Sequence, residues 1–286
     1  MNRTRRQWKL WPIRAARELN VMGGVAATGG AILTATAALG FDIRSNVWAA
    51  IASIVGLVIM GAPLLWALWR ARPPELLDAS NLVGTELEVH QLDNVYQPLP
   101  KLGVVGPVEV GKSTLVNNLR QKPAPGERTQ VVRAYVTSFQ TTPTRYLAIV
   151  DGGGDPLAQQ FNVAAPADVL FIVLDHNLSD EEETVDRGRV NSCKYFAQQL
   201  RGYLRTERSN NPVGWVHVLM NKRDLWENAP RSDQQQIQEL LEEEVAAWQN
   251  SNLTQRVTST PYSNSYTGDV NTLLDKLIAF VQEQYG

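Results

Sequence analysis

The feature that most constrains the fold of this chain is the run Gly106-Pro107-Val108-Glu109-Val110-Gly111-Lys112-Ser113. It has the pattern G-x-x-x-x-G-K-S, in which glycines let successive backbone N–H groups turn inward around a phosphate without an intervening Cβ. An apolar run at 101–105 precedes it, and a helical pattern at 113–119 follows it. The order strand, loop, helix predicts a phosphate-binding loop that any nucleoside triphosphate could occupy. The residues expected to contact the nucleotide are Gly106, Glu109, Val110, Gly111, Lys112, Ser113 and Thr114.

A second run indicates which base is bound. Asn221-Lys222-Arg223-Asp224 follows the apolar stretch 214–220 and has the pattern N-K-x-D. A carboxylate at Asp224 can accept the N1 and exocyclic N2 hydrogens of guanine, which adenine does not present. Either run alone could be a chance match of a loop. The pair, each directly after a strand-like run, predicts a GTP site.

The rest of the C-terminal part alternates between strand and helix patterns. Besides 101–105 and 214–220, strands are expected at 131–139, 146–150 and 169–174. Helices are expected at 113–119, 232–249 and 270–284, with a further long helix starting near the acidic run 179–183, whose acids would oppose the positive end of the helix dipole. Strands separated by helices predict an α/β domain with a parallel sheet covered on both faces.

Two stretches without charged residues lie near the N-terminus, at 19–41 and 45–69. As helices they reach about 35 Å, which exceeds the roughly 30 Å of a bilayer's hydrocarbon core. We therefore expect two transmembrane helices, 19–41 and 47–69, joined as a hairpin. Basic residues flank both outer ends and only Arg44 lies in the turn, which places both ends at the cytoplasmic face. A cleaved signal peptide is the alternative, but it would need one hydrophobic segment and would leave the GTP site outside the cell.

The charge distribution supports a division into parts with different surroundings. Residues 1–72 carry a net charge of +7, whereas residues 73–286 carry −9. The single cysteine, Cys193, excludes a disulfide framework within the chain and fits a reducing compartment. The expected parts are a basic cytoplasmic or interfacial tail at 1–18, the hairpin at 19–69, a linker at 70–99 and the nucleotide domain at 100–286. The acidic domain shows no basic, aromatic-rich surface, so nucleic acid is not an expected partner.

Residues 100–286 resemble the Ras-like GTPases of the TRAFAC class, because the two motifs occur in the order that these proteins have. A third motif of theirs, D-x-x-G, matches Asp151-Gly152-Gly153-Gly154. The run D-G-G-G-D is similar to the Arf-like pattern, and a Ras-like domain behind a membrane anchor resembles the receptor β-subunit of the signal-recognition particle. That subunit has one span where two are expected here, so its function is not implied. The resemblance implies a Ras-like P-loop NTPase fold, GTP and GDP as ligands, Mg²⁺ and GTP hydrolysis.

The resemblance also implies roles on the phosphate side. Lys112 would reach the β- and γ-phosphates, Ser113 would hold Mg²⁺ through its hydroxyl, and Asp151 would contact the ion through water. The Gly154 N–H would face the γ-phosphate. Thr129, which precedes an expected strand, would close over the ion. An expected strand or its turn contains the less suitable threonines, Thr137, Thr141 and Thr142.

On the base side, the resemblance implies that Asp224 binds guanine, Asn221 ties the loops together and the aliphatic part of Lys222 lies along the ring. The last motif of these proteins, S-A-K, is matched only faintly by Ser263-Asn264-Ser265, where Ser263 and Asn264 would line the base. Serine and asparagine in a turn need no further explanation, so this match is also consistent with an ordinary loop.

Two departures from the pattern bear on hydrolysis. Asp155 follows D-x-x-G where many such proteins have the glutamine that orients the attacking water, and a shorter, negative side chain should do this poorly. Val108 stands where Ras has glycine, and it crowds the space that an arginine supplied by a partner would need. Slow intrinsic hydrolysis is expected. Arg128 is a candidate for an arginine supplied by the chain itself, although a surface role accounts for it as well.

Three classes of function remain open at this stage. The first is a membrane-anchored GTPase switch, whose loops are ordered by GTP so that a protein effector binds one state. The second is a scaffold that keeps GTP with almost no turnover. The third is a subunit of a membrane complex, with the hairpin as the functional part and the nucleotide domain as its regulator. In each class the expected partners are a guanine nucleotide, the lipid bilayer and a protein.

Overall fold

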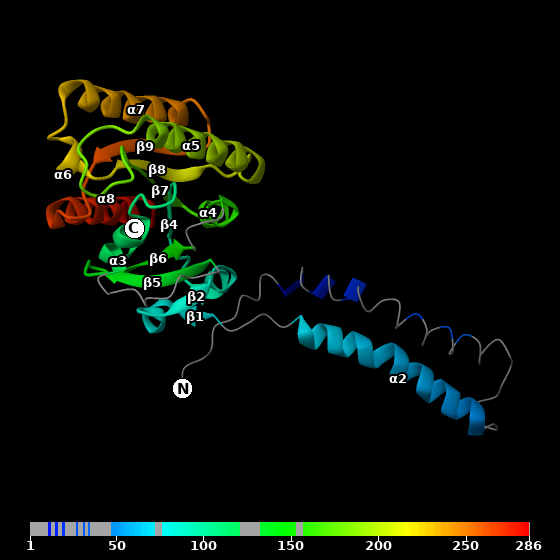
Figure 1. The fold of residues 1–286 in the computed structure, drawn as a ribbon. Coiled ribbons are helices and arrows are strands. Elements are labelled where there is room, and N and C mark those ends of the chain that lie inside the picture. Colours follow the sequence, from blue (N-terminus) through cyan, green and yellow to red (C-terminus); the bar gives the residue numbers. More distant parts are fainter. Residues whose placement is uncertain are drawn as a thin grey trace. The chain divides into compact units, whose positions relative to one another are not determined.

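The computed structural model of the chain (Figure 1) describes the residues 11–12, 15–16, 19–20, 27, 31, 34, 47–71, 76–120, 132–152 and 157–285. The chain divides into two compact units, Met1–Leu76 and Leu77–Gly286. The second unit holds every sequence motif discussed above.

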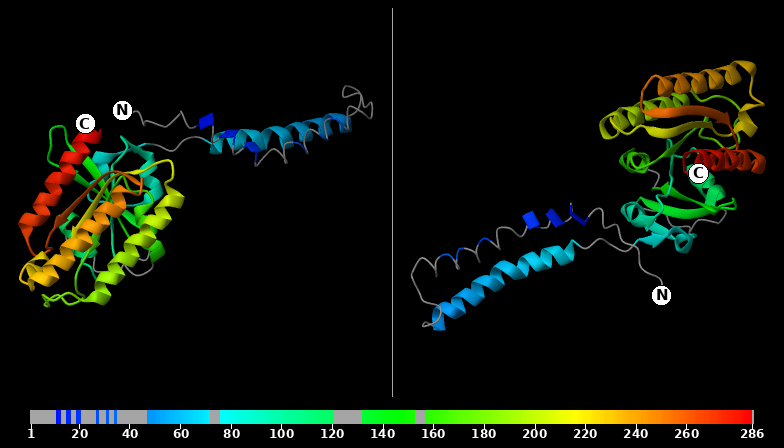
Figure 2. Two further views of the ribbon diagram at one scale, coloured as in Figure 1. Left: turned by 90° about the horizontal axis from the view of Figure 1, so that it is seen from above. Right: turned by 180° about the vertical axis from the view of Figure 1, so that it is seen from behind.

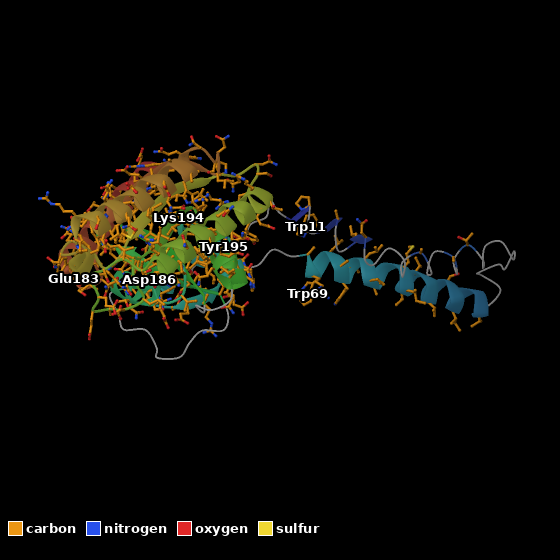
Figure 3. The ribbon with its side chains drawn as sticks, turned by 45° about the horizontal axis from the view of Figure 1, so that its top comes forward. Trp11, Trp69, Glu183, Asp186, Lys194 and Tyr195 are labelled. Atoms are coloured by element: carbon orange, nitrogen blue, oxygen red, sulfur yellow. The ribbon has the colours of Figure 1, made fainter. Side chains whose placement is uncertain are left out.

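The first unit contains the long helix α2, Val47–Arg70. Among the described residues, it provides the one stretch long and apolar enough to cross a membrane, Ser53–Arg70. Its surface is largely apolar and exposed, and the Trp69 side chain points away from the helix (Figure 3). The helix coincides with the second predicted span. Most of the first predicted span, 19–41, lies outside the described residues, so two spans are not shown.

The second unit is built on a seven-stranded sheet in the order β2-β5-β6-β4-β7-β8-β9. In chain order, its strands are β2 (Glu86–Glu88), β4 (Lys101–Val105), β5 (Arg133–Phe139), β6 (Arg145–Asp151), β7 (Val169–Leu174), β8 (Val213–Met220) and β9 (Thr254–Pro261). β2, β5 and β6 pair antiparallel, whereas β6, β4, β7, β8 and β9 run parallel. The sheet is therefore mixed and mostly parallel, which confirms the α/β expectation.

Helices cover both faces of this sheet (Figure 2). They are α3 (Lys112–Arg120), α4 (Leu157–Ala164), α5 (Arg187–Glu207), the short α6 (Arg223–Trp226), α7 (Arg231–Gln249) and α8 (Thr267–Tyr285). One core cluster joins the sheet to α3 and α8 through residues such as Leu115 and Leu273. The other joins it to α5 and α7 through residues such as Phe196 and Trp248. Successive residues of β7 alternate between the two clusters, as side chains of a strand buried on both faces must.

The helix expected to start near 179–183 begins only at Arg187. Asp186 caps it, accepting a hydrogen bond at Oδ1 from Gly188 N at 2.8 Å. Within the acidic run, the Ser179 hydroxyl instead accepts from the backbone N–H groups of Glu181 and Glu182, each at 3.2 Å. Such local bonds offer the backbone an alternative to helix, so the prediction that the acids form the first turn was wrong.

The segment expected to be a linker, 70–99, is structured from Leu77 onward. It contains the strands β1 (Leu77–Asp78), β2 and β3 (Val95–Tyr96) and the 3-10 helices η2 (Ala79–Leu82) and η3 (Val89–Asn94). Its apolar side chains belong to the same extended core cluster as those of α5 and α7, among them Leu82, Leu92, Val95 and Leu99. The segment thus supplies an edge strand and part of the core. Its apolar residues are too widely spaced to show a strand or helix period.

Candidate functional site

The phosphate loop joins β4 to α3 at the carboxyl edge of the parallel strands, where ligands bind in open α/β sheets. A Cβ on Gly106 would lie 2.2 Å from the Val173 carbonyl oxygen, so only glycine fits there. Gly111 has φ +84°, a conformation that favours glycine, and Glu109 adopts φ 64° despite its side chain. The backbone of the loop is therefore shaped by the close approach of its neighbours.

Lys112 and the residues after it begin α3 at the end of this loop. The Lys112 ammonium donates to the carbonyl oxygen of Gly106 at 3.0 Å and to that of Pro107, so it lies across the loop. Ser113 and Thr114 are exposed at the start of the helix. Their hydroxyl groups are accessible to an ion or a phosphate.

Two asparagines tie the base-side loops to the phosphate loop. Asn221, after β8, donates through Nδ2 to the Val110 carbonyl at 2.8 Å. Asn264, after β9, donates through Nδ2 to the Gly111 carbonyl at 3.1 Å. Three segments far apart in the sequence thus meet at 110–111.

Lys222 is buried and adopts the left-handed conformation, with φ 61°. Its ammonium donates to the carbonyl groups of the turn after β7, at 2.7 Å to Asn177, 3.2 Å to Leu178 and 2.9 Å to Ser179. It also lies 3.0 Å from Asp180 Oδ1. The ammonium therefore holds the 177–180 turn, and the contact between its aliphatic part and a guanine ring stays a prediction.

The remaining base-side residues lie in α6 and in the turn before α8. Asp224 is partly exposed in the first turn of α6, and its carboxylate makes no hydrogen bond or ion pair within the described part of the chain. Ser263 is buried, and its backbone N–H donates to Asp269 Oδ2 at 2.9 Å. The Ser263 hydroxyl accepts from Ser265 N at 3.0 Å. Because the Asp224 carboxylate has no partner within the described part of the chain, it is available to a ligand.

Asp151 ends β6 on the phosphate side of the sheet. Its Oδ2 lies 3.6 Å from Nη2 of Arg120, a buried side chain whose Nη1 is 3.8 Å from Glu86 on β2. Burial raises the pKa of Asp151, and the cations Arg120 and Lys112 oppose this shift. The Asp151 carboxylate therefore interacts with Arg120 in addition to any ion that it binds.

The oxygen donors of this region match the preference of Mg²⁺ for one or two protein ligands completed by water and phosphate. The exposed Ser113 hydroxyl and the Asp151 carboxylate provide them. No group of three or more His, Cys, Asp and Glu side chains suited to a metal occurs in the described residues, so a binding site made of protein ligands alone is not found there. Thr129, Gly154 and Asp155 lie outside the described residues, and their expected roles stay predictions.

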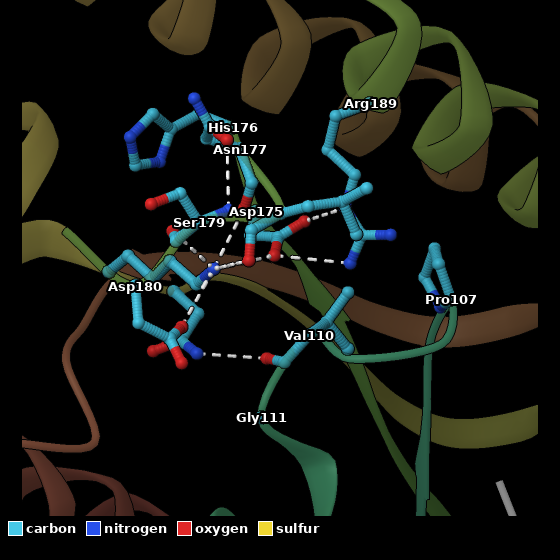
Figure 4. Close-up of polar contacts among 12 residues, drawn as sticks. Pro107, Val110, Gly111, Asp175, His176, Asn177, Ser179, Asp180 and Arg189 are labelled. Atoms are coloured by element: carbon cyan, nitrogen blue, oxygen red, sulfur yellow. Dashed lines mark hydrogen bonds and ion pairs between the residues drawn. The ribbon is translucent and has the colours of Figure 1, made fainter. Parts of the chain in front are cut away.

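The sequence motifs did not reveal a buried ion pair beside the phosphate loop (Figure 4). Asp175, directly after β7, is fully buried and binds Arg189 of α5 through both carboxylate oxygens. Arg189 also donates through Nη2 to the Val108 carbonyl at 2.7 Å. The sequence indicates this ion pair only through an aspartate directly after an all-apolar strand. This position predicts that the aspartate lies at the carboxyl edge of the sheet but does not identify the residue that it binds.

A comparison with protein families matches part of the chain. Residues 101–222 match the family described as 50S ribosome-binding GTPase. No curated protein matches the chain significantly.

Solved structures resemble the chain at low identity. A bacterial selenocysteine-specific elongation factor EF-Sec is 15% identical, with a TM-score of 0.45 over 65% of this chain and 29% of its own. A GTP-binding protein of Sulfolobus solfataricus in complex with GDP is 20% identical, with a TM-score of 0.41 over 64% of this chain and 53% of its own. Roco2 RocCORdC of Methanosarcina barkeri, bound to GDP, is 18% identical, with a TM-score of 0.40 over 70% and 52%. The chain thus spans between about a third and a half of these proteins.

Proposed function

We propose that the chain is a membrane-anchored GTP-binding protein with slow hydrolysis, and that residues 101–222, which match the family described as 50S ribosome-binding GTPase, belong to a GTPase domain of the TRAFAC class. It would recruit or regulate a protein partner at the cytoplasmic face. The observation that carries the nucleotide part is the pair of asparagine bonds at 110–111, which join the base-side loops to the phosphate loop. A loop for phosphate and a carboxylate for the base are thereby held as one site.

Specificity for guanine is assigned to Asp224. A carboxylate accepts two hydrogen bonds side by side, which matches the N1 and N2 hydrogens of guanine, whereas adenine offers no such pair. Asp224 has no competing partner within the described part of the chain, and Asn221 and Lys222 before it are fixed by their contacts. The ligands would be GTP and GDP.

Replacement of Asp224 by alanine tests this assignment. An unpaired buried donor costs about 1–3 kcal/mol and more beside a lost charge, so the affinity for GTP should fall by about tenfold or more. Asp275→Ala, an exposed aspartate on α8, is the matched control and should bind as the wild type does. Fluorescence titration with labelled GTP and ATP measures both. Equal binding of the two nucleotides by the wild-type chain would remove the basis of the proposal.

On the phosphate side, we assign the triphosphate to Lys112, Gly111 and Gly106 and the magnesium ion to Ser113, Asp151 and Thr129. A bound Mg²⁺ would offset the charge of the phosphates. Slow turnover is also proposed because Val108, an exposed residue of the loop, adds a branched side chain where Ras has glycine. Asp155 is proposed to orient water poorly, with Gly154 facing the γ-phosphate. A single-turnover assay on the purified chain measures the rate.

The proposal of membrane anchoring starts from the apolar, exposed surface of α2 and from the contrast in charge between the two parts of the sequence. Core helices of soluble proteins also satisfy the criterion of length and composition, so anchoring needs the direct test given in the Discussion. A GTP-binding scaffold without turnover and a regulatory subunit of a membrane complex are the alternatives. The family description names ribosome binding. The net charge of −9 over residues 73–286 does not favour a surface for RNA.

A further inference from the structure

We propose that Arg189 is a positioning residue of the nucleotide site, which fixes the phosphate loop through the Val108 carbonyl and joins it to the guanine-binding motif through Asp175. The inference rests on the proposed function and adds to it residues outside the three sequence motifs. Figure 4 shows Arg189 paired with Asp175, near Pro107 of the loop.

The geometry of Arg189 serves two partners at once. Its Nε and Nη2 bind the two oxygens of Asp175, the second at 3.1 Å, and Nη2 also donates to the Val108 carbonyl at 2.7 Å. Arg189 is 5% exposed and Asp175 is 0% exposed. The planar guanidinium has five donors in a fixed fork, so binding the carboxylate also sets the direction in which Nη2 meets the loop.

Holding the Val108 carbonyl orients the next N–H group. The peptide bond between Val108 and Glu109 is planar and trans, so the Glu109 N–H points opposite to the Val108 carbonyl. Because Arg189 holds that carbonyl on its own side, the N–H is presented on the other side, for an oxygen of the phosphate chain. In this arrangement Glu109 has φ 64°, a backbone conformation that is unfavourable for a residue with a Cβ. The hydrogen bond from Arg189 stabilises the strained peptide.

Asp175 connects this arrangement to the base side. Its Oδ2 lies 3.5 Å from the Lys222 ammonium, which also holds the 177–180 turn. A chain of buried charges therefore runs from the phosphate loop through Arg189, Asp175 and Lys222 to the motif that ends in Asp224. Each link fixes the position of the next.

Stability alone gives a poor account of this network. Desolvation of a buried ion pair can exceed the Coulombic gain, and apolar side chains of similar volume often stabilise a fold as well or better. Arg189 also donates a hydrogen bond to a carbonyl of the phosphate loop, and an apolar side chain could not make this bond. Positioning of the loop is the contribution that this pair makes beyond packing.

Arg189→Lys is the first test, because it keeps the charge that pairs with Asp175 but loses the fork that also reaches Val108. We expect the affinity for GDP and GTP to fall by about tenfold, with faster GDP dissociation. The ratio of GDP to IDP affinity should stay as in the wild type, because the exocyclic amine that distinguishes these ligands faces Asp224. A general loss of structure would instead change both quantities and lower the melting temperature of the nucleotide-free chain.

Arg201→Lys is the matched control. Arg201 lies on the same helix, twelve residues after Arg189, and pairs with the buried Glu244 of α7. The control should bind GDP as the wild type does. Should Arg189→Lys fold poorly, the double variant Asp175→Leu/Arg189→Met removes both charges and leaves neither unpaired, and it should fold yet bind GDP at least tenfold more weakly.

Wild-type affinity in either folded variant would overturn the role of Arg189, whereas loss of GDP binding in Arg201→Lys as well would show a general effect of α5 and would also overturn it. Absence of guanine nucleotide binding by the wild-type chain is a different result, because it refutes the proposed function itself and this inference with it.

Discussion

At the scale of single residues, the sequence predicted which residues form the motifs. It did not predict which other residues hold those motif residues in position. Asn221 was expected to tie loops together because N-K-x-D has that arrangement in similar proteins, and its bond to Val110 has the expected form. Asp175 and Arg189 are fourteen residues apart and meet only because a strand end faces the first turn of α5. A sequence pattern records spacing along the chain, and such a contact depends on how the elements are arranged.

His217 illustrates a buried group with a measurable effect. It lies in β8, with Nδ1 2.6 Å from the Thr258 hydroxyl, and burial, together with the cations Lys276 and Arg256, lowers its pKa from 6.5 to about 3. Below pH 6.5 the unfolded chain binds a proton that the folded chain does not. The free energy of unfolding should therefore fall with falling pH, by at most about 1.4 kcal/mol per pH unit from this group.

Urea unfolding of the wild type and of His217→Gln between pH 7.5 and 5 measures this effect. The variant should show a shallower dependence on pH. Some dependence should persist in it, because burial also lowers the pKa of His176, which acts with the same sign. Identical slopes for the two proteins would contradict the assignment to His217.

At the scale of elements, strands with continuous apolar runs were the most predictable. β7 and β8 were expected within one residue of their bounds, because burial on both faces requires apolar side chains throughout. β9, Thr254–Pro261, was not foreseen, since an edge strand with polar residues on its partly exposed positions carries neither a run nor a clear alternation. The start of α5 was misplaced because an acidic run and an N-cap aspartate are both typical of helix starts.

The cap at the start of α5 can be tested directly. Asp186→Ala removes the acceptor for Gly188 N and should lower the free energy of unfolding by about 0.5–2 kcal/mol. Glu183→Ala is the control, because this exposed residue of the acidic run lies outside the helix (Figure 3) and should change stability by less than about 0.5 kcal/mol. Chemical denaturation compares the two. A larger loss in Glu183→Ala than in Asp186→Ala would place the functional start of the helix in the acidic run after all.

At the scale of the whole molecule, two units of different composition have to be accounted for. The second carries the proposed nucleotide site, and its sheet could be expected from the strand and helix order, apart from β9 and the part that 77–96 adds to it. The first is basic, with one apolar exposed helix among its described residues. Hydropathy alone cannot separate a membrane span from an apolar helix that a partner covers, because both need only an apolar surface.

Thiol labelling of intact cells distinguishes the possible topologies. With Cys193→Ala as background, cysteines are introduced singly at Asn2, Ser45 and Ser209, the last of which is exposed on the nucleotide domain. A hairpin predicts that an impermeant reagent modifies the cysteine at 45 and neither of the others, because both chain ends would face the cytoplasm. A single span through α2 predicts that the cysteine at 2 also reacts while that at 209 stays protected.

The wild-type chain, which keeps Cys193, provides a control. Burial raises the pKa of Cys193 to about 12, so this thiol should remain unmodified in the folded wild-type chain, and its labelling would report unfolded protein. Protection of all three introduced cysteines, with the chain in the soluble fraction, would refute membrane anchoring, and α2 would then be assigned to a contact with another protein. Modification at 209 from outside would overturn the cytoplasmic placement of the GTP site. The nucleotide assignment does not depend on this result, because the loops around 106–113 and 221–224 are held by contacts within the second unit alone.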